Sequence, residues 1–360
     1  MNETLQDLMR SATRLTQAGR LNEATAAIQR ALRGAAPAAT PARPESSAEV
    51  LDGCVFEVET PAPAATKSAH ATFINGTHTH AGLTRGYKLF VPPARAGKPR
   101  ALLVMLHGCT QDPDDFAAGT GMNDAALEEG FVVLYPAQAQ DANPSRCWNW
   151  FKHTHQQRGR GEPAVIADMA RAVMKEHSID PRRVYIAGLS AGGAMAIIVA
   201  EAYPELFAAV GVHSGLPRGA ASSVPEALSV MGTGVAGNAP QPRAGRIDDA
   251  APVRVPTIVF HGDQDRTVHP RNGEQVLAAA LGGTVAGAAR VEQGTAGQGR
   301  RYTRSSHAAD DGTTQAEHWL LHGAGHAWSG GRAAGSYTDA AGPDATREML
   351  RFFFEHPLRP

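Results

Sequence analysis

The sequence has no long apolar run and almost no net charge. No stretch of its 360 residues approaches the 18 or more apolar residues of a membrane span. The N-terminal segment MNETLQDLMRSATRLTQ also lacks the basic and apolar regions of a secretory signal. The net charge is -1 and the lysines and arginines are dispersed, so no basic surface is available for nucleic acid or lipid. We therefore expect a cytoplasmic protein that binds neither nucleic acid nor a membrane.

Cysteine is equally scarce. The three cysteines, Cys54, Cys109 and Cys147, are too few for a disulfide scaffold, and none stands in a Cys-x-x-Cys pair. The tripeptide His-Thr-His occurs at 78–80 and at 153–155, and two histidines at this spacing on a strand can bind a metal. No neighbouring cysteine or acidic cluster completes either ligand set. We expect both tripeptides to lie in solvated loops, and we expect neither a metal nor a cofactor.

Three regions differ in composition. Residues 1–33 carry two helical patterns separated by Gly19, and they resemble a single tetratricopeptide-type hairpin. One such unit cannot bury its own apolar face, so we expect it to pack on the main body or to contact a partner, a second copy included. Residues 34–52 are rich in Pro and Ala, which is typical of a linker. The main domain is expected over 53–360.

Strand and helix patterns alternate along this domain. The runs ALLVML and FVVLYP are continuously apolar, as in central parallel strands covered on both faces, and amphipathic helical patterns separate the later strands. This order predicts an α/β fold with a mostly parallel sheet and helices on both faces, whose ligands bind at the carboxyl ends of the strands. Residues 215–252 are rich in Gly, Pro and Ala, which favours a loop or a lid.

The segment VYIAGLSAGGAMAI contains the pattern Gly-x-Ser-x-Gly around Ser190. The pattern follows a predicted strand and opens a predicted helix, the context of a nucleophile elbow. Such a turn exposes the serine hydroxyl in a strained backbone conformation, and the glycines on either side provide the space that it needs. The alternative is a structural turn, but the context favours Ser190 as a nucleophile.

A serine nucleophile needs a base and an acid that orients the base, and in this fold the acid precedes the histidine in the chain. The segment FHGDQD offers Asp263 and Asp265 after a predicted strand. We favour Asp265, which lies deeper in the loop, and expect Asp263 to cap the turn through its own backbone. The segment WLLHGAGHAW offers His322 and His326. We favour His326, which lies in the glycine-rich loop, and expect His322 to pack at the strand end.

The negative oxygen that forms during attack by Ser190 needs two N–H donors. One is expected from Ala191, directly after the nucleophile. The other is expected from the loop HGCTQ, which resembles the HG-type loops of esterases, with Cys109 as the first choice and Thr110 as the alternative.

Three of the four tryptophans lie near this predicted site. Trp148 and Trp150 occur in the loop after the strand FVVLYP, and Trp328 follows His326 by two residues. They could form an apolar wall for the ester, or they could only pack the loops together, and we expect at least one to contact substrate.

The cysteines Cys109 and Cys147 follow consecutive predicted strands, so a disulfide could join them and tie the donor loop to the aromatic loop. A cytoplasmic location predicts instead that both stay reduced. The sequence leaves the two alternatives open.

Together, LHGCTQDPDDF, CWNWF, VYIAGLSAGG, FHGDQD and GAGHAWSGG resemble the α/β-hydrolase esterases of the poly(3-hydroxybutyrate) depolymerase family, which are similar to feruloyl and acetylxylan esterases. The matching segments lie within about 101–331. Carried over by motif, the resemblance implies the α/β-hydrolase fold and no cofactor. It implies a triad of Ser190, Asp265 and His326, with an oxyanion hole formed by Cys109 and Ala191.

We therefore expect a serine carboxylic-ester hydrolase that acts through an acyl-enzyme on short-chain hydroxyalkanoate esters, oligoesters or polyesters. The alternative within enzymes is an esterase for aryl or sugar esters. A non-catalytic binding protein on the same scaffold is a third reading, against which the complete triad argues. Because no secretory signal and no polymer-binding domain are seen, we do not expect action on crystalline extracellular polymer.

Overall fold

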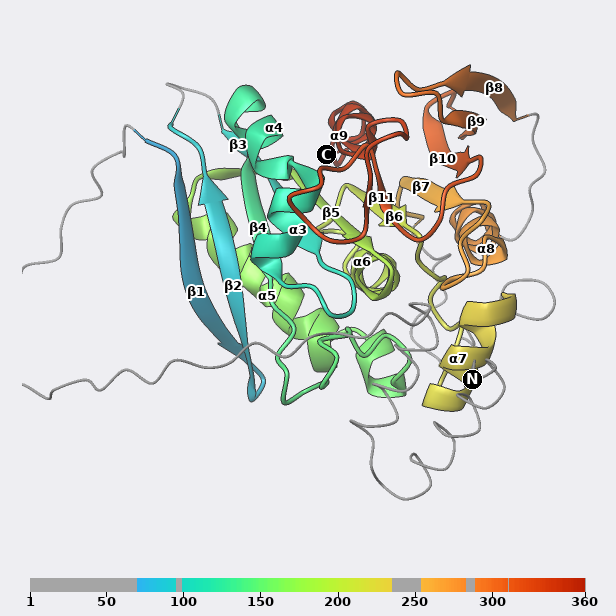
Figure 1. The fold of residues 1–360 in the computed structure, drawn as a ribbon. Coiled ribbons are helices and arrows are strands. Elements are labelled where there is room, and N and C mark those ends of the chain that lie inside the picture. The colour runs from blue at the N-terminus through green and yellow to red at the C-terminus, as the bar shows by residue number, and fades with distance from the viewer. Residues whose placement is uncertain (1–69, 95–98, 235–253, 283–288, 310, 360) are drawn as a thin grey trace, which may run out of the picture. The chain divides into compact units, whose positions relative to one another are not determined.

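The computed structural model describes residues 70–94, 99–234, 254–282, 289–309 and 311–359 (Figure 1). The helical hairpin expected over 1–33 and the linker expected over 34–52 lie outside the described residues, as does the 235–252 part of the expected lid. These expectations stay predictions. The described residues have the α/β architecture that the alternation of strand and helix patterns predicts.

A ten-stranded sheet forms the centre of the fold, in the order β1-β2-β4-β3-β5-β6-β7-β10-β9-β8. The strands from β4 to β10 in this order are parallel, and the hairpins β1–β2 and β8–β9 extend the two edges antiparallel. The strands are β1 (Thr72–His80), β2 (Leu83–Val91), β3 (Arg100–Leu106), β4 (Val132–Pro136), β5 (Ile179–Leu189), β6 (Ala209–His213), β7 (Thr257–Gly262), β8 (Arg290–Thr295), β9 (Arg301–Ala308) and β10 (Thr314–Leu321).

The central strands are buried because their side chains are apolar on both faces of the sheet. In β3, Leu102, Val104 and Leu106 pack into one core, while Leu103 and Met105 pack into the core on the opposite face. All five side chains are buried, which explains why the run ALLVML shows no alternation of apolar and polar residues.

Helices cover both faces of the sheet (Figure 1). Side chains of α5 and α6 join the core with Leu102, and side chains of α3, α4 and α9 join the core with Leu103. None of the helices in the described ranges is long and apolar enough to cross a membrane. The helices are α3 (Pro113–Thr120), α4 (Met122–Glu129), the 3-10 helix η1 (His153–Gln156), α5 (Gly161–Glu176), α6 (Ala191–Ala202), α7 (Val224–Thr233), α8 (Arg271–Ala280) and α9 (Ala345–Glu355).

The hairpin of β8 and β9 is not expected from the sequence. The β8 sequence RVEQGT carries a single large apolar residue, Val291, and that side chain is exposed at the edge of the sheet. An edge strand that buries little has no apolar periodicity to recognise.

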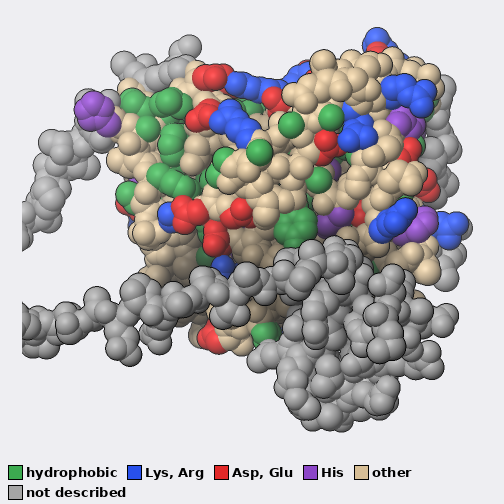
Figure 2. Space-filling model, in the orientation of Figure 1, with side chains coloured by type: hydrophobic (Ala, Val, Ile, Leu, Met, Phe, Trp, Pro, Cys, Tyr) green, Lys and Arg blue, Asp and Glu red, His purple; other side chains and the backbone are tan. Residues whose placement is uncertain are grey.

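The charged side chains are mixed over the surface. Figure 2 shows Lys and Arg interspersed with Asp and Glu over the visible face, in keeping with their dispersion along the chain.

The register of the parallel strands brings several loops to one edge of the sheet. Leu189 at the end of β5 pairs with His213 of β6, His213 pairs with Phe260 of β7, and Phe260 pairs with Trp319 of β10. The segments that follow these strands therefore start from the same level, which is where ligands of a parallel sheet bind. Ser190, Asp265 and His326 all lie in these segments.

Candidate active site

Ser190 lies between the last residue of β5 and the first residue of α6, with φ 58° and ψ -120°. Its N–H donates to the carbonyl oxygen of His213, 2.8 Å away. A serine held in this backbone region costs on the order of 1–3 kcal/mol, and such strain is typical of functional sites. The turn directs the residue out of the sheet at the N-terminus of α6, whose dipole favours negative charge.

The close packing behind this turn explains its glycines. A Cβ at Gly188 would lie 2.4 Å from the backbone carbon of Gly192, and a Cβ at Gly192 would lie 2.0 Å from the carbonyl oxygen of Leu106. Any side chain at either position would therefore collide with backbone, which cannot move aside. The Gly-x-Ser-x-Gly pattern is a steric requirement of this turn.

Asp265 and His326 form an acid–base pair beside Ser190. His326 Nδ1 lies 2.7 Å from Asp265 Oδ2, and Asp265 Oδ1 accepts the backbone N–H groups of Thr267 and Val268 at 2.9 and 2.8 Å. The carboxylate side chain has no exposed surface, while the imidazole keeps 10%. The acid is thus fixed on both oxygens, and it holds the imidazole with Nδ1 as a donor and Nε2 as the free nitrogen.

The surroundings of Asp265 keep it ionised. Burial alone would raise the pKa of the carboxyl, but the nearby His261 ring and hydrogen bonds from His326 and the Val268 amide outweigh burial and hold that pKa well below its usual range. A permanently ionised acid stabilises the imidazolium that forms when His326 accepts a proton.

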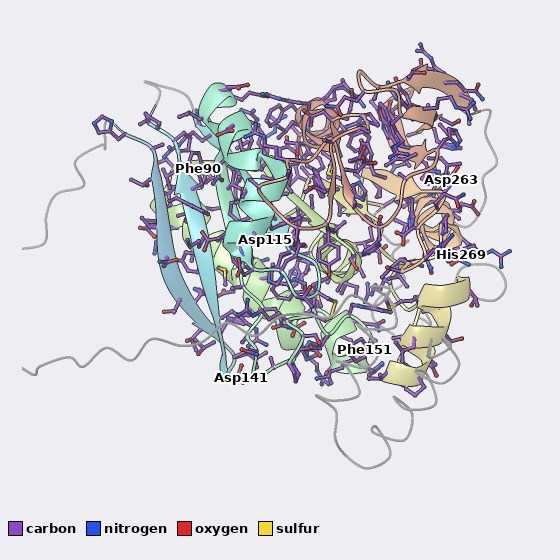
Figure 3. The ribbon with its side chains drawn as sticks, viewed as in Figure 1. Phe90, Asp115, Asp141, Phe151, Asp263 and His269 are labelled. Carbon is purple, nitrogen blue, oxygen red and sulfur yellow. A yellow bond between two sulfur atoms is a disulfide. The ribbon has the colours of Figure 1, made fainter. Side chains whose placement is uncertain are left out.

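Asp263 and His322 form a second carboxylate–imidazole pair, which contacts β9 and not Ser190. Asp263, at the end of β7 (Figure 3), accepts from His322 Nδ1 at 3.1 Å and from the Gly323 N–H at 2.7 Å. His322 Nε2 lies 2.9 Å from Thr303 Oγ1 on β9, and β9 lies on the side of β10 away from β5. The expectation that Asp263 caps its own turn is wrong, because its partners come from the loop after β10. His322 does lie at the strand end, but its side chain is 30% exposed.

Several contacts place His326 on the side of Ser190. The imidazole of His213, whose carbonyl binds Ser190, stacks on Trp328 with ring centroids 5.2 Å apart, and Trp328 follows His326 by two residues. His213 Nε2 also accepts the N–H of Ser329 at 3.0 Å. Among the residues that the structure describes, no hydrogen bond joins Ser190 Oγ to His326. In many unliganded enzymes this contact tightens only when substrate binds.

The loop after β3 carries Cys109 and Thr110, the two candidates for the second oxyanion donor. Within it, Gly108 N donates to Gln111 Oε1 at 2.9 Å, Thr110 N donates to the Ser145 carbonyl at 2.7 Å, and Gln111 N donates to the Gly108 carbonyl. The N–H of Cys109 has no acceptor within the described part of the chain. Between the two candidates for the second oxyanion donor, this geometry favours Cys109 and excludes Thr110, whose N–H is already bound.

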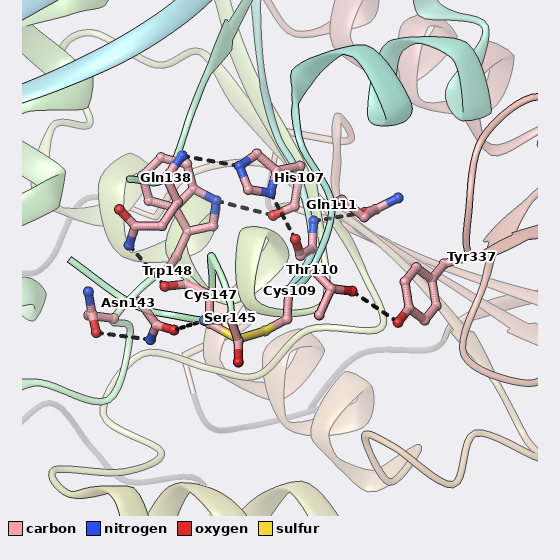
Figure 4. The surroundings of a disulfide bond; sticks show 12 residues. His107, Cys109, Thr110, Gln111, Gln138, Asn143, Ser145, Cys147, Trp148 and Tyr337 are labelled. Atoms are coloured by element: carbon pink, nitrogen blue, oxygen red, sulfur yellow. Dashed lines mark hydrogen bonds between the residues drawn. A yellow bond between two sulfur atoms is a disulfide. The ribbon is translucent and has the colours of Figure 1, made fainter. Parts of the chain in front are cut away.

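A disulfide joins Cys109 to Cys147, 38 residues later, and ties this loop to the loop after β4 (Figure 4). The same two loops are joined by the indole N–H of Trp148, which donates to the His107 carbonyl at 3.1 Å. The donor loop is therefore held in place before any substrate arrives. Disulfides persist in oxidising compartments, which does not fit the expected cytoplasmic location. That location stays a prediction.

A family model described as "Esterase PHB depolymerase" matches residues 85–299. The match covers more than half of the chain and includes the elbow at Ser190 and the acid at Asp265. The chain belongs to the PHB depolymerase esterase family. His326 lies beyond the matched residues, and its place beside Asp265 comes from the structure.

Relatives of this esterase family include depolymerases and feruloyl esterases. Poly(3-hydroxyalkanoate) depolymerase C of Paucimonas lemoignei is 36% identical over 180 residues, which are 49% of this chain and 43% of that protein. Feruloyl esterase B of Neurospora crassa is 30% identical over 197 residues, which are 52% of this chain and 66% of that protein. The chain thus spans about half the length of the curated relatives it matches.

A solved acetyl xylan esterase from Aspergillus awamori superposes with a TM-score of 0.59 at 21% identity, over 75% of this chain and 94% of that one. At this identity the likeness concerns the fold alone. It confirms the α/β-hydrolase fold for the described residues.

The tryptophans do not form the predicted apolar wall. Trp148 is fully buried and bound to His107, and Trp328 is 1% exposed between Phe116 and His213, with its indole N–H donating to Thr346. Trp150 is 4% exposed. A side chain without free surface cannot contact substrate, so the prediction is wrong for Trp148 and Trp328. These residues pack the loops together, which is the alternative that the sequence left open.

A buried carboxylate that the sequence alone does not reveal contacts the loop after β4. Glu162, at the start of α5, has no exposed surface and accepts from Asn149 N at 2.8 Å and from Gln138 Nε2 at 2.6 Å. Burial opposes its ionisation, but the nearby His155 ring and hydrogen bonds from Gln138 and Asn149 hold its pKa below the ordinary value. No motif marks such a residue, because its donors Gln138, Asn149 and Arg85 lie at irregular distances along the chain.

The expectation that the two His-Thr-His tripeptides lie in solvated loops is wrong. His78 and His80 lie on β1, with ring nitrogens 2.8 and 3.1 Å from the same oxygen of Asp168 on α5. His155 lies in η1 with Nδ1 3.3 Å from Glu162. Within the described ranges, no group of three or more His, Cys, Asp or Glu side chains is arranged to hold a metal ion.

Proposed function

We propose that this protein is a serine carboxylic-ester hydrolase that acts through an acyl-enzyme on short-chain hydroxyalkanoate esters and oligoesters. The observation that carries the proposal is a strained Ser190 at the nucleophile elbow, level with a buried Asp265–His326 pair and next to an unused Cys109 N–H. Membership of the esterase family supports the same chemistry.

In the first step Ser190 Oγ attacks the ester carbonyl carbon while His326 Nε2 accepts the hydroxyl proton. The carbonyl oxygen becomes negative and is bound by the N–H groups of Cys109 and Ala191. When the tetrahedral intermediate collapses, the bond to the alcohol oxygen breaks, and the proton on His326 passes to that oxygen. The alcohol leaves, and the acyl group stays on Ser190.

In the second step water attacks the acyl-enzyme, with His326 as the base again. The same two N–H groups bind the negative oxygen, and collapse returns the proton to Ser190 Oγ. The acid product leaves, and the free enzyme is restored. Asp265 stays ionised throughout and holds the imidazole in the required tautomer.

The hydroxyalkanoate class is favoured by the depolymerase of Paucimonas lemoignei, which is the more similar of the two relatives described above. The second candidate is an aryl-ester or sugar-ester esterase, which the similarity to feruloyl esterase B favours. Both candidates use the same triad, so they differ only in the acyl and alcohol groups that the site accepts.

The test compares purified wild-type protein with Ser190→Ala and, as a matched control, Ser305→Ala on β9. We expect the wild type and the control to release 3-hydroxybutyrate from hydroxybutyrate oligomers and Ser190→Ala to release none, with circular dichroism spectra unchanged. Faster release of ferulate from methyl ferulate would favour the second candidate. Full activity in folded Ser190→Ala would exclude the mechanism.

A further inference from the structure

Among the described residues, an exposed aromatic side chain lies at the site, and it is not one of the tryptophans. Tyr337 follows His326 by eleven residues in the chain, with 40% of its surface exposed and φ at 51°. Its carbonyl oxygen accepts the N–H of Trp328 at 2.7 Å, next to the short pairing of β11 (Trp328–Ser329) with β12 (Thr338–Asp339). A bulky residue at positive φ is uncommon, and it persists only where the surroundings hold it.

Its neighbours hold this turn firmly. The N–H of Ser336 donates to Asp115 Oδ1 at 2.7 Å, and Gln111 Nε2 donates both to the Ser336 carbonyl at 3.2 Å and to Asp115 Oδ2 at 2.9 Å. Asp115 belongs to α3 (Figure 3), and Gln111 belongs to the loop after β3 that carries Cys109, here called the oxyanion loop. The turn that carries Tyr337 is therefore rigid, and it is anchored to the oxyanion loop.

The Tyr337 side chain joins the two halves of the site. Its ring meets the imidazole of His326 edge to face, with centroids 6.4 Å apart and planes at 79°. Its hydroxyl lies 3.1 Å from Thr110 Oγ1, beside Cys109 (Figure 4). One exposed ring thus lies between the catalytic base and the loop that carries the oxyanion donor.

We propose that Tyr337 contacts the alcohol part of the ester and selects alcohols that present an apolar or aromatic surface. This rests on the proposed esterase function. His326 must pass its proton to the departing alcohol oxygen, so the alcohol lies against His326 while the carbonyl oxygen is bound at Cys109 and Ala191. The ring of Tyr337 is the exposed aromatic surface on that side of His326.

The contact should act on the alcohol and leave the acyl group unaffected. A benzyl or alkyl alcohol can pack on the ring, whereas methanol is too small to cover it. One aromatic contact of this kind corresponds to a few-fold to roughly tenfold difference in kcat/KM. The chemical class that this favours is an ester whose alcohol carries an apolar chain or ring directly after the oxygen.

Two substrate series test the proposal on the full-length protein. Methyl and benzyl butyrate share an acyl group and have leaving alcohols of similar acidity, while methyl acetate, butyrate and hexanoate share an alcohol. We expect Tyr337→Ala to lower kcat/KM for benzyl butyrate by roughly tenfold and for each methyl ester by less than twofold, with the loss mainly in KM. Tyr337→Phe and Thr110→Val keep the ring and remove the hydroxyl bridge, so they should retain the wild-type preference.

Two results would overturn the proposal. The first is an equal loss on every ester together with a shifted pH midpoint of kcat/KM, because a residue that only positions His326 acts on all substrates alike. The second is a loss that depends on acyl length at constant alcohol. If the folded wild type hydrolyses none of these esters, the esterase function itself fails and this inference fails with it.

Discussion

Three buried histidines should make the protein unstable in mild acid. Burial, the largest cause in each case, lowers the pKa of His107 to about 4 and the pKa values of His213 and His318 to about 3. An exposed histidine of the unfolded chain has a pKa of about 6.5. Between these values the unfolded chain binds protons that the folded protein does not. The stability is therefore fully present above about pH 6.5 and falls as the pH drops toward 4.

The size of the loss follows from the linkage relation. When the pH falls from 7.5 to 5.5, each histidine that stays neutral in the folded state removes about 1.3 kcal/mol from the free energy of unfolding. Three such residues together remove about 4 kcal/mol, a large part of the 5–15 kcal/mol that is typical of a domain. His177 and His307 are shifted in the same direction by burial, and they add to the loss.

Urea unfolding at pH 7.5 and at pH 5.5, followed by circular dichroism, measures this loss. His318 Nε2 is buried without a hydrogen-bond partner, so His318→Leu removes one titrating group without breaking a hydrogen bond. That variant should lose about 3 kcal/mol over the same interval, and His153→Gln, which changes an exposed histidine, should lose as much as the wild type. If the free energy of unfolding of the wild type differs by less than about 1 kcal/mol between pH 7.5 and pH 5.5, the order of a single titrating histidine, the reasoning is refuted.

Two further predictions concern the acid and the disulfide. Asp265→Asn should lower kcat on a butyrate ester by about 10³–10⁴, because the amide reverses the tautomer of the imidazole, whereas Asp263→Asn should stay within a few-fold of wild type. Equal losses would contradict the assignment of the acid. Replacing Cys147 with Ser opens a loop of 38 residues, which should cost about 4 kcal/mol in urea unfolding and also lower kcat through the freed Cys109 amide. Unchanged unfolding and unchanged kcat would show that the bond constrains neither.

The sequence predicts those parts of the site that depend on local backbone geometry. Ser190 is found because its turn needs glycine two residues before and two residues after it, and a five-residue sequence pattern records that requirement. Asp265 is favoured over Asp263 on loop position, and the structure places it against His326. The central strands are found because burial on both faces makes their sequences continuously apolar.

The rest depends on where distant segments meet. Tyr337 reaches the oxyanion loop through a contact between residues 227 positions apart, and no local pattern records such a contact. The tryptophans show the reverse case, in which nearness to the site in sequence gives no contact with it. Trp148 and Trp328 lie next to the site in sequence, but the direction of a loop side chain is decided by packing, and both point inward.

The Thr303–His322–Asp263 cluster repeats the hydroxyl, imidazole and carboxylate of the active site in one and the same molecule. Thr303 stands in a regular strand that pairs with β8 on one side and with β10 on the other, so its amides are committed to the sheet. It lacks the strained turn and the spare N–H donors that surround Ser190. The protein thus carries its own comparison between a hydrogen-bonded set of side chains within a sheet and the candidate nucleophile at a strained turn, and the two sets differ in their backbone.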